Sequence, residues 1–256
     1  MTIKIMFSKS VQNSKQILNC IKEFKSDLGT VFGNGDRNII KLFDLDGKTI
    51  NIKSFKIPNV VNKVAYKHFR KSKAKRSFEY ATILLEKGIG TPQPLAYFEN
   101  FNKFGLLDSY YVSEHLDCDL TFRELVEIPD YPDHENILRQ FVKFTFDLHE
   151  AGIEFLDHSP GNTLIKKVAE GKYNFYLVDL NRMNFHESMS FTTRMKNFSR
   201  LTPKQDMIKV MSNEYAKYYS ETEETIFENM WMETAVFQEK FAKKKRLKKR
   251  LKFWKK

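Results

Sequence analysis

Two polar side chains, Asp157 and Asn162, lie five residues apart in a short segment of the sequence. Between them stand Ser159, Pro160 and Gly161, which are residues typical of tight turns. An Asp and an Asn at this spacing can act on one phosphoryl group, because the Asp can accept the proton of an attacking hydroxyl group while the Asn holds a magnesium ion. The segment therefore predicts phosphoryl-transfer chemistry.

A second carboxylate, Asp179, follows a predicted β-hairpin. Residues 162–167 are expected to form a strand, 169–172 a turn, and 173–178 a second strand that is rich in aromatic and branched side chains. Asp179 stands at the end of that strand, where the second metal-binding Asp of a kinase stands.

The segment before the loop has the apolar spacing of a helix that Gly152 closes at its C-terminus. The apolar face of this helix consists of Ile137, Leu138, Phe141, Phe144, Thr145 and Leu148. An Asp and an Asn five residues apart are commonplace by themselves. The order of helix, loop, hairpin and terminal Asp is what favours a kinase-like fold.

The same stretch resembles a known family. Residues 148–153 (LHEAGI) lead into Asp157 and Asn162, and residues 178–182 (VDLNR) follow. This pattern is similar to that of the lipopolysaccharide core kinases, the Kdo and heptose kinases of Gram-negative bacteria, which are relatives of protein kinases. The resemblance covers roughly residues 30–215.

Two positions depart from the pattern of protein kinases. Phe155 stands where kinases commonly have a His two residues before the catalytic Asp, and Asn181 replaces the Gly of the Asp-Phe-Gly motif. The resemblance therefore points to the lipopolysaccharide branch of the superfamily.

The resemblance implies a two-lobed α+β fold of the protein-kinase type, with a small β-rich N-lobe and a mainly helical C-lobe. ATP is expected in the cleft between the lobes, with Mg²⁺ held by Asn162 and Asp179. Asp157 is expected to orient the acceptor hydroxyl group and take its proton. Catalysis of this kind depends mostly on positioning and charge neutralisation.

Three segments are expected along the chain: an N-lobe over residues 1–116, a C-lobe over 117–239, and a basic amphipathic tail over 240–256. Glu114 is a candidate nucleotide-binding residue, because residues 114–116 fit the hinge where adenine hydrogen-bonds to the backbone.

The first strands carry the candidate nucleotide-binding glycines. Residues 44–47 (DLDG) predict a hairpin turn between two strands within 30–57. Gly33 and Gly35 would let backbone amides approach the phosphates of a nucleotide. An ordinary turn explains this Gly-x-Gly nearly as well.

Lys53 lies in the strand after the hairpin and is the candidate that binds the nucleotide phosphates. Lys41 and Lys67 are rival candidates. Glu79, on a helix predicted over residues 77–87, matches the helix Glu that pairs with the strand Lys in the resembling family. Glu86 is the alternative, but a carboxylate near a helix C-terminus is mildly disfavoured by the helix dipole.

Several basic residues after the hairpin of residues 162–178 fit either a structural or a substrate-binding role. Arg182 is also explained as a structural salt-bridge partner. Arg194, Lys196 and Arg200 either contact a substrate phosphate or form a solvated face.

The net charge of +11 is concentrated at one end. Residues 240–256 contain 11 Lys and Arg and no acidic residue; subtracting these 11 from the 43 basic residues of the chain leaves 32, which equals the number of acidic residues. A general nucleic-acid-binding domain would not show this distribution, so nucleic acid is an unlikely partner.

Phe241, Leu247, Leu251 and Trp254 recur in this tail at roughly helical spacing, which favours an interfacial helix on an anionic membrane. A solubilising tail and nonspecific nucleic-acid binding are the alternatives.

Composition places the chain among folded proteins, because 41% of its residues are hydrophobic and 14% are aromatic. Cys20 and Cys118 fit no metal or redox spacing, which suits a reducing cytosol. No signal peptide and no stretch near 18 apolar residues is visible. We expect a cytoplasmic protein, peripheral at the inner membrane of a Gram-negative bacterium.

Two other functions are compatible with the site. A phosphotransferase of the aminoglycoside or choline type uses a similar Asp, Asn and Asp, but its soluble substrate leaves the basic tail unexplained. A membrane-associated pseudokinase would keep the fold without turnover, but all three polar site residues are present.

Overall fold

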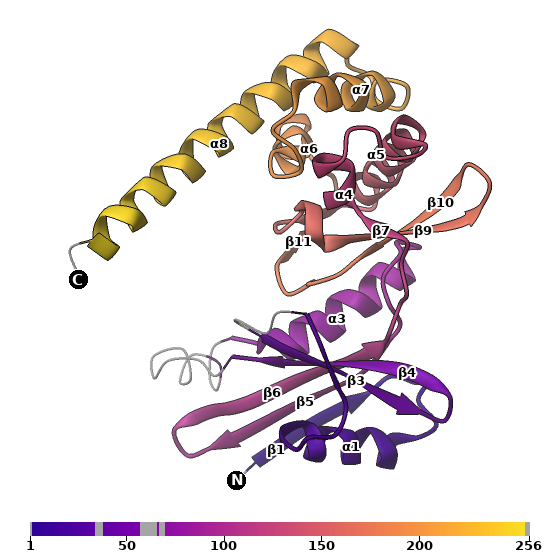
Figure 1. Ribbon diagram of the computed structural model, residues 1–256, viewed down its shortest axis with the longest axis vertical. Helices are drawn as coiled ribbons and strands as arrows, with labels where there is room; N and C mark the ends of the chain where they lie inside the picture. Colours follow the sequence, from indigo (N-terminus) through magenta and orange to yellow (C-terminus); the bar gives the residue numbers. More distant parts are fainter. Residues whose placement is uncertain (1, 34–37, 57–65, 67–69, 254–256) are drawn as a thin grey trace. The chain divides into compact units, whose positions relative to one another are not determined.

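The computed structural model describes residues 2–33, 38–56, 66 and 70–253 (Figure 1). The chain divides into two compact units. The N-terminal unit consists of Met1–Asp117 together with Asp179–Asn181, and the C-terminal unit consists of Cys118–Val178 and Arg182–Lys256. The short segment Asp179–Asn181, which follows the predicted β-hairpin, thus belongs to the N-terminal unit.

The N-terminal unit contains a six-stranded antiparallel sheet in the order β1-β5-β6-β4-β3-β2. Leu45 pairs with Lys48, so Asp46 and Gly47 form a two-residue turn between β3 and β4. Both turn residues have positive φ, 54° and 80°, as a type I′ turn requires. The strands are β1 (Thr2–Phe7), β2 (Thr30–Phe32), β3 (Asn38–Leu45), β4 (Lys48–Phe55), β5 (Pro94–Asn102) and β6 (Gly105–Glu114).

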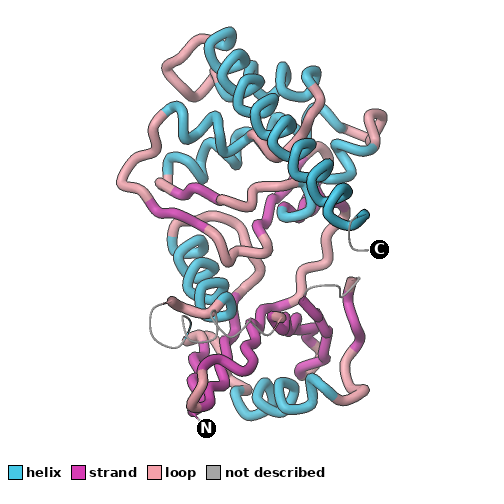
Figure 2. Tube along the Cα trace, turned by 90° about the vertical axis from the view of Figure 1, so that its left-hand side faces the viewer, coloured by secondary structure: helices cyan, strands magenta, loops and turns pink. Residues whose placement is uncertain are grey.

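Helices cover both faces of this sheet (Figures 1 and 2). On one face lie α1 (Ser14–Lys22) and the short 3₁₀ helix η1 (Glu23–Lys25), and on the other lies α3 (Lys73–Glu86). Successive side chains of a strand point to opposite faces. Ile50 and Ile52 of β4 therefore pack in the α1 cluster, whereas Phe55 packs in the α3 cluster, and Lys53 shares the face of Phe55.

The C-terminal unit is mainly helical, with two small sheets in the strand orders β10-β9-β7 and β11-β8. Its helices are α4 (Phe122–Glu127), α5 (His134–Glu150), η2 (Pro160–Asn162), α6 (Phe191–Phe198), α7 (Gln205–Tyr215) and α8 (Glu223–Phe253). Its strands are β7 (Leu120–Thr121), β8 (Ile153–Phe155), β9 (Thr163–Ala169), β10 (Lys172–Leu177) and β11 (Met183–Phe185).

The elements on either side of the candidate loop are those that the sequence predicts. Helix α5 buries the predicted apolar face, in which Ile137, Phe141 and Leu148 have no exposed surface. Strands β9 and β10 pair as an antiparallel hairpin in which Thr163 lies opposite Leu177. The predicted helix and hairpin are therefore confirmed, and β9 extends two residues beyond the prediction.

Gly152 fixes the exit of the chain from α5. It follows the C-cap Ala151 and has φ of +73°, a conformation that L side chains rarely adopt. The N–H group of His186 donates to the Gly152 carbonyl oxygen at 2.8 Å. A Cβ atom at position 152 would lie only 2.0 Å from the His186 oxygen. Glycine is thus required here for two reasons, backbone conformation and close approach.

No helix among the described residues is long and apolar enough to span a membrane.

We predict that Gly152→Ala destabilises the protein more than Gly88→Ala. Gly88 follows α3 with nearly the same φ, +74°, but has no atom within 4 Å of an added Cβ. Gly88→Ala should cost about 1 kcal/mol for the backbone conformation alone. Gly152→Ala should add the cost of displacing the His186 carbonyl. Urea unfolding followed by circular dichroism measures both, and equal costs would contradict the close approach.

Candidate active site

Lys53 and Asp179 form an ion pair in the N-terminal unit, with Lys53 Nζ 2.9 Å from Asp179 Oδ1. The Lys53 side chain is 14% exposed, and its ammonium group also lies over the ring of Phe55 at 5.6 Å. Asp179 has φ of +59°, which is uncommon for any residue other than glycine. Asn181 Nδ2 donates to the same Oδ1 atom at 2.7 Å. The predicted phosphate-binding cation and the predicted metal ligand are therefore in direct contact.

The rival Lys41 lies on the other face of the sheet. It pairs with Ile52 across β3 and β4, so its side chain shares the α1 face. Its ammonium group donates to the carbonyl oxygens of Ser26 at 2.6 Å and Leu28 at 3.0 Å. These contacts assign Lys41 a structural role. Lys67, the other rival, lies outside the described residues.

The expected ion pair between Lys53 and Glu79 is not formed, and this expectation was wrong. Glu79 lies on α3 and instead contacts Lys71 Nζ at 2.9 Å and Lys75 Nζ at 4.0 Å. Lys75 is one helical turn before Glu79, and Lys71 immediately precedes the Ser72 N-cap of α3. Two nearer lysines thus neutralise this carboxylate. The alternative, Glu86, is exposed at the end of α3.

The other nucleotide candidates lie at strand ends. Gly33 follows β2 with φ of +79°, and no atom lies within 4 Å of an added Cβ. Gly35 lies outside the described residues. Glu114 ends β6, and its N–H group donates to the Gln93 carbonyl oxygen at 2.9 Å. An adenine contact by the Glu114 backbone would therefore use its carbonyl oxygen.

Side chains from two later positions, together with one from the loop itself, hold the candidate catalytic loop of the C-terminal unit. Three consecutive carbonyl oxygens each accept a side-chain hydrogen bond. Asn197 Nδ2 donates to Phe155 O at 2.9 Å, and Arg200 Nη1 donates to Leu156 O at 2.7 Å. Asn162 Nδ2 donates to Asp157 O at 2.8 Å. The backbone on both sides of the Asp157 side chain is therefore fixed.

Two guanidinium groups bind the Asp157 carboxylate. Arg200 Nη1 lies 2.7 Å and Arg182 Nη1 lies 3.2 Å from Asp157 Oδ1. Both contacts use the same oxygen, and no hydrogen bond to Oδ2 is formed by the residues that the structure describes. The carboxylate is thus oriented through one oxygen, Oδ1.

Arg194, Lys196 and Arg200 lie in three different environments. Arg194 is buried, where it contacts Glu150 Oε1 at 2.6 Å and lies over the Tyr219 ring at 5.0 Å. It is a structural residue of the C-terminal unit. Lys196 is exposed. Of the three residues proposed to contact phosphate, only Arg200 lies at the candidate catalytic loop.

A family model for the lipopolysaccharide kinase (Kdo/WaaP) family matches residues 33–221, which is most of the chain. The chain belongs to this family. The structure is also similar to a solved structure described as WaaP in complex with acyl carrier protein, with a TM-score of 0.64 and 15% identity over 94% of this chain and 98% of that chain. Comparison with curated proteins gives no match.

The family match and the shared fold confirm the main expectations. The protein is a kinase that transfers a phosphoryl group to a sugar hydroxyl of the lipopolysaccharide core, and its fold is the kinase-like α+β fold. Membership in a kinase family implies the use of ATP. The separate reading as a phosphotransferase of the aminoglycoside or choline type is therefore set aside.

The oxygen donors of this lipopolysaccharide kinase suit Mg²⁺. The Asp179 carboxylate is a hard anionic donor, and the Asn162 amide has its nitrogen engaged with Asp157 O, so its oxygen is the atom that would face a metal ion. The described residues contain no group of three or more His, Cys, Asp or Glu side chains that would hold a metal. A kinase magnesium site does not need one, because phosphate oxygens and water complete the coordination.

Two buried histidines, neither of them a predicted site residue, support the candidate catalytic loop. Tyr215 Oη donates to His149 Nδ1 at 2.9 Å, and His149 Nε2 donates to Asn197 Oδ1 at 3.2 Å, a tautomer assigned from these neighbours. Burial lowers the pKa of His149 to about 3. The ring is therefore neutral and orients the amide that holds Phe155 O.

His158 directly follows the catalytic candidate and is fully buried. Its ring packs beside Phe141 and Phe155, with centroid distances of 5.5 and 5.8 Å. Burial lowers the pKa of His158 to about 4, opposed by the neighbouring Asn197 and reinforced by the charge of Arg200. A neutral aromatic ring thus lies beneath the loop.

We predict that the unfolding free energy falls as the pH is lowered from 6.5 to 5. An unfolded His titrates near pH 6.5, whereas the folded pKa values are about 4 and about 3, so the unfolded state binds more protons in this window. Each histidine contributes up to ~1.4 kcal/mol per pH unit. The variant His158→Phe should lose roughly half of this dependence. Urea titrations at several pH values measure it, and an unchanged slope in the variant would contradict the assignment.

Proposed function

We propose that this kinase transfers the γ-phosphoryl group of ATP to a hydroxyl group of Kdo or heptose in the lipopolysaccharide inner core through Asp157, Asn162, Asp179 and Lys53. The observation that carries the assignment is the 2.9 Å contact between Lys53 and Asp179. It joins a cation from β4 to a carboxylate that follows β10. The two residues are far apart in the sequence, so the fold brings them together.

Lys53 binds the nucleotide phosphates in this proposal, and Asp179 and Asn162 hold Mg²⁺. When bound, the metal would neutralise charge on the phosphate oxygens. Lys53 and Asp179 neutralise each other in the free protein, so neither charge needs another protein partner before the nucleotide arrives. The backbones of Gly33, Gly35 and Glu114 remain candidates for further nucleotide contacts. Glu79 is a weaker candidate, because Lys71 and Lys75 occupy its carboxylate.

Asp157 acts on the acceptor. Arg200 and Arg182 hold its Oδ1 atom, so Oδ2 is the oxygen that orients the sugar hydroxyl and accepts its proton. Three hydrogen-bonded carbonyl oxygens keep the loop in place, which limits the reorganisation needed for transfer.

We predict that Asp157→Asn and Asp179→Ala each lower the rate of phosphoryl transfer by on the order of 100-fold or more, because one removes a positioned base and the other a metal ligand. The measurement is transfer of radiolabelled phosphate from ATP to lipopolysaccharide extracted from cells that lack the protein. Circular dichroism should show that both variants remain folded.

The matched control is Asp147→Asn, which changes an exposed carboxylate on α5 that pairs with Lys143. It should leave the rate unchanged. Near wild-type rates in both site variants would refute the roles assigned to Asp157 and Asp179.

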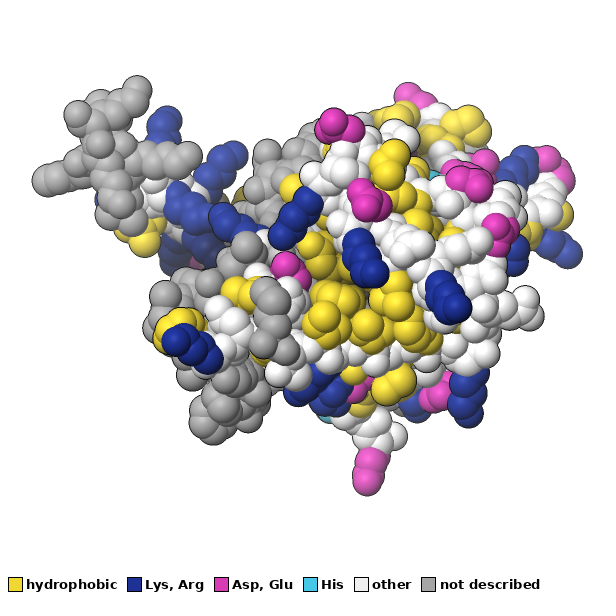
Figure 3. All heavy atoms as spheres, turned by 90° about the horizontal axis from the view of Figure 1, so that it is seen from below, with side chains coloured by type: hydrophobic (Ala, Val, Ile, Leu, Met, Phe, Trp, Pro, Cys, Tyr) yellow, Lys and Arg dark blue, Asp and Glu magenta, His cyan; other side chains and the backbone are white. Residues whose placement is uncertain are grey.

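We also propose that the basic end of α8 binds an anionic membrane surface, which places the kinase at the cytoplasmic face of the inner membrane. Helix α8 continues to Phe253, and Lys and Arg side chains gather at its C-terminal end (Figure 3). Phe241 and Leu247 are 56% and 58% exposed among them. Each basic residue near an anionic leaflet contributes about 1 kcal/mol of binding. A lipid-anchored acceptor is encountered at such a surface.

We predict that deletion of residues 240–256 weakens binding to anionic liposomes and lowers activity on the lipid-anchored acceptor. Activity on a soluble acceptor fragment should change little, because the deletion leaves the catalytic residues in place. Cosedimentation with phosphatidylglycerol vesicles at low salt measures binding. Equal binding by full-length and truncated protein would refute the membrane role. Acyl carrier protein is a second ligand to test, because it is the partner named for the WaaP structure.

A further inference from the structure

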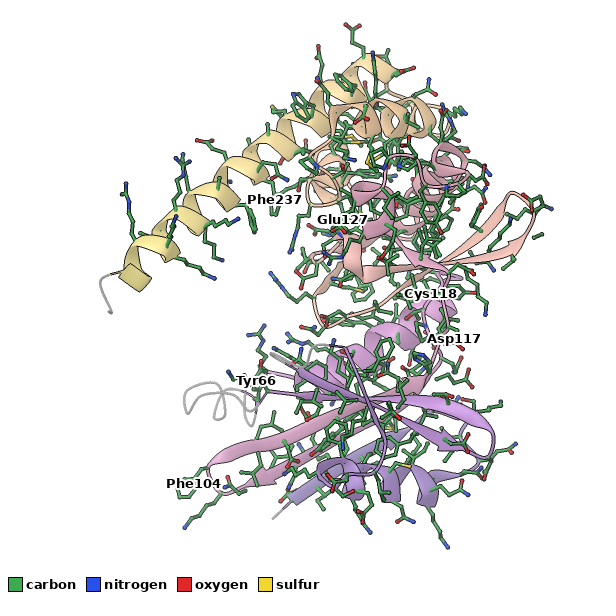
Figure 4. All side chains as sticks on the ribbon, in the orientation of Figure 1. Tyr66, Phe104, Asp117, Cys118, Glu127 and Phe237 are labelled. Atoms are coloured by element: carbon green, nitrogen blue, oxygen red, sulfur yellow. The ribbon has the colours of Figure 1, made fainter. Side chains whose placement is uncertain are left out.

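An aromatic side chain of helix α8, Phe237, contacts an arginine that binds the candidate catalytic loop. Its buried face consists of Ile226, Met230 and Thr234, which are spaced four residues apart. Phe237 continues this face by one turn and points from α8 toward the other elements of the C-terminal unit (Figure 4). Residues 239–250 are exposed. Phe237 is therefore the last apolar side chain of α8 that is partly buried before the basic end begins.

The partner of Phe237 is Arg200. The Arg200 guanidinium carbon lies 5.6 Å from the centre of the Phe237 ring, within the range of a cation–π contact. The same guanidinium group donates through Nη1 to Leu156 O and to Asp157 Oδ1, both at 2.7 Å. Its Nε atom is buried and forms no hydrogen bond with the described residues. The polar contacts of Arg200 are thus directed to the catalytic loop.

A planar guanidinium group that donates along one edge and stacks through one face has little rotational freedom. The Phe237 ring supplies the surface that fixes the plane, and the Asp157 carboxylate and Leu156 carbonyl fix the edge. Arg182 also contacts Asp157, but it does so at 3.2 Å with a side chain that is 55% exposed. Arg200, with 34% exposure and a shorter contact, is the better-fixed of the two.

We propose that Arg200 is the positioning residue for the Asp157 carboxylate, and that Phe237 of α8 positions Arg200. In this arrangement α8 is part of the catalytic apparatus and not only an extension that carries basic residues. The inference rests on the proposed role of Asp157 as the base. It is independent of the proposed membrane binding, because removal of residues 240–256 leaves Phe237 in place.

The test compares kcat and the KM for ATP in four variants, again with lipopolysaccharide from cells that lack the protein as acceptor. Arg200→Ala should lower kcat by roughly 100-fold, as expected for a misplaced catalytic group, and leave the KM for ATP nearly unchanged. Phe237→Leu keeps an apolar side chain but removes the ring, and should lower kcat by a smaller factor. Arg200→Lys keeps the charge but lacks the planar group, so adding Phe237→Leu to it should cause no further loss.

Two controls separate positioning from general damage. Val236→Ala changes an exposed neighbour of Phe237 on α8 and should leave kcat unchanged. Low concentrations of guanidinium should restore part of the activity of Arg200→Ala, whereas urea should not. A purely structural role for Arg200 would give loss of stability without this rescue.

Asp157→Asn, measured in the same assay, distinguishes the possible failures. If Asp157→Asn is inactive and Arg200→Ala has wild-type kcat, the positioning role is wrong and the proposed base stands. If Asp157→Asn is active, the proposed base itself is wrong. Equal losses on adding Phe237→Leu to the wild type and to Arg200→Lys would overturn the link from α8 to Arg200.

Discussion

The ion pair between Lys53 and Asp179 is the contact on which the proposed nucleotide-binding part of the site depends. It draws the segment after β10 into the N-terminal unit, which otherwise consists of the first 117 residues. A partly buried carboxylate needs a cation and further hydrogen bonds, and Asp179 receives both from Lys53 and Asn181. The same contacts hold its unusual backbone conformation, a form of strain that persists only where the surroundings fix it.

This ion pair depends in turn on the register of one hairpin. The two-residue turn at Asp46 and Gly47 places Lys53 on the α3 face of the sheet and Lys41 on the α1 face. A slip of one residue would exchange the faces of every side chain in β4. The turn therefore decides which of the two lysines can reach Asp179.

The proposed acceptor-binding part of the site is organised differently. Its loop is short, and side chains of later elements hold it: Asn197 from α6, Arg200 just after α6, and Phe237 from α8 through Arg200. The neutral, buried rings of His149 and His158 complete this support without adding a further positive charge to those of Arg182 and Arg200. The family resemblance rests on Asp157 and Asn162, whereas the side chains that hold their loop come from elements later in the chain.

The contrast explains what the sequence could and could not predict. Helix α5 and the β9–β10 hairpin were predictable, because periodicity and spacing are local properties. The placement of Lys53 and Lys41 on opposite faces was also within reach, since the Asp46-Gly47 turn fixes which residues share a face. The partner of Glu79 was not, because three lysines compete for one carboxylate and only the fold decides between them. The contact between Arg200 and Phe237 was not predictable either, because it joins distant segments of the chain.

The most direct test of the central claim is mass spectrometry of lipopolysaccharide from cells that lack this protein. The account predicts inner-core species that are lighter by one phosphate group on Kdo or heptose, and it predicts that the wild-type protein restores the phosphate whereas Asp157→Asn does not. Identical phosphate content with and without the protein, or full restoration by Asp157→Asn, would contradict it.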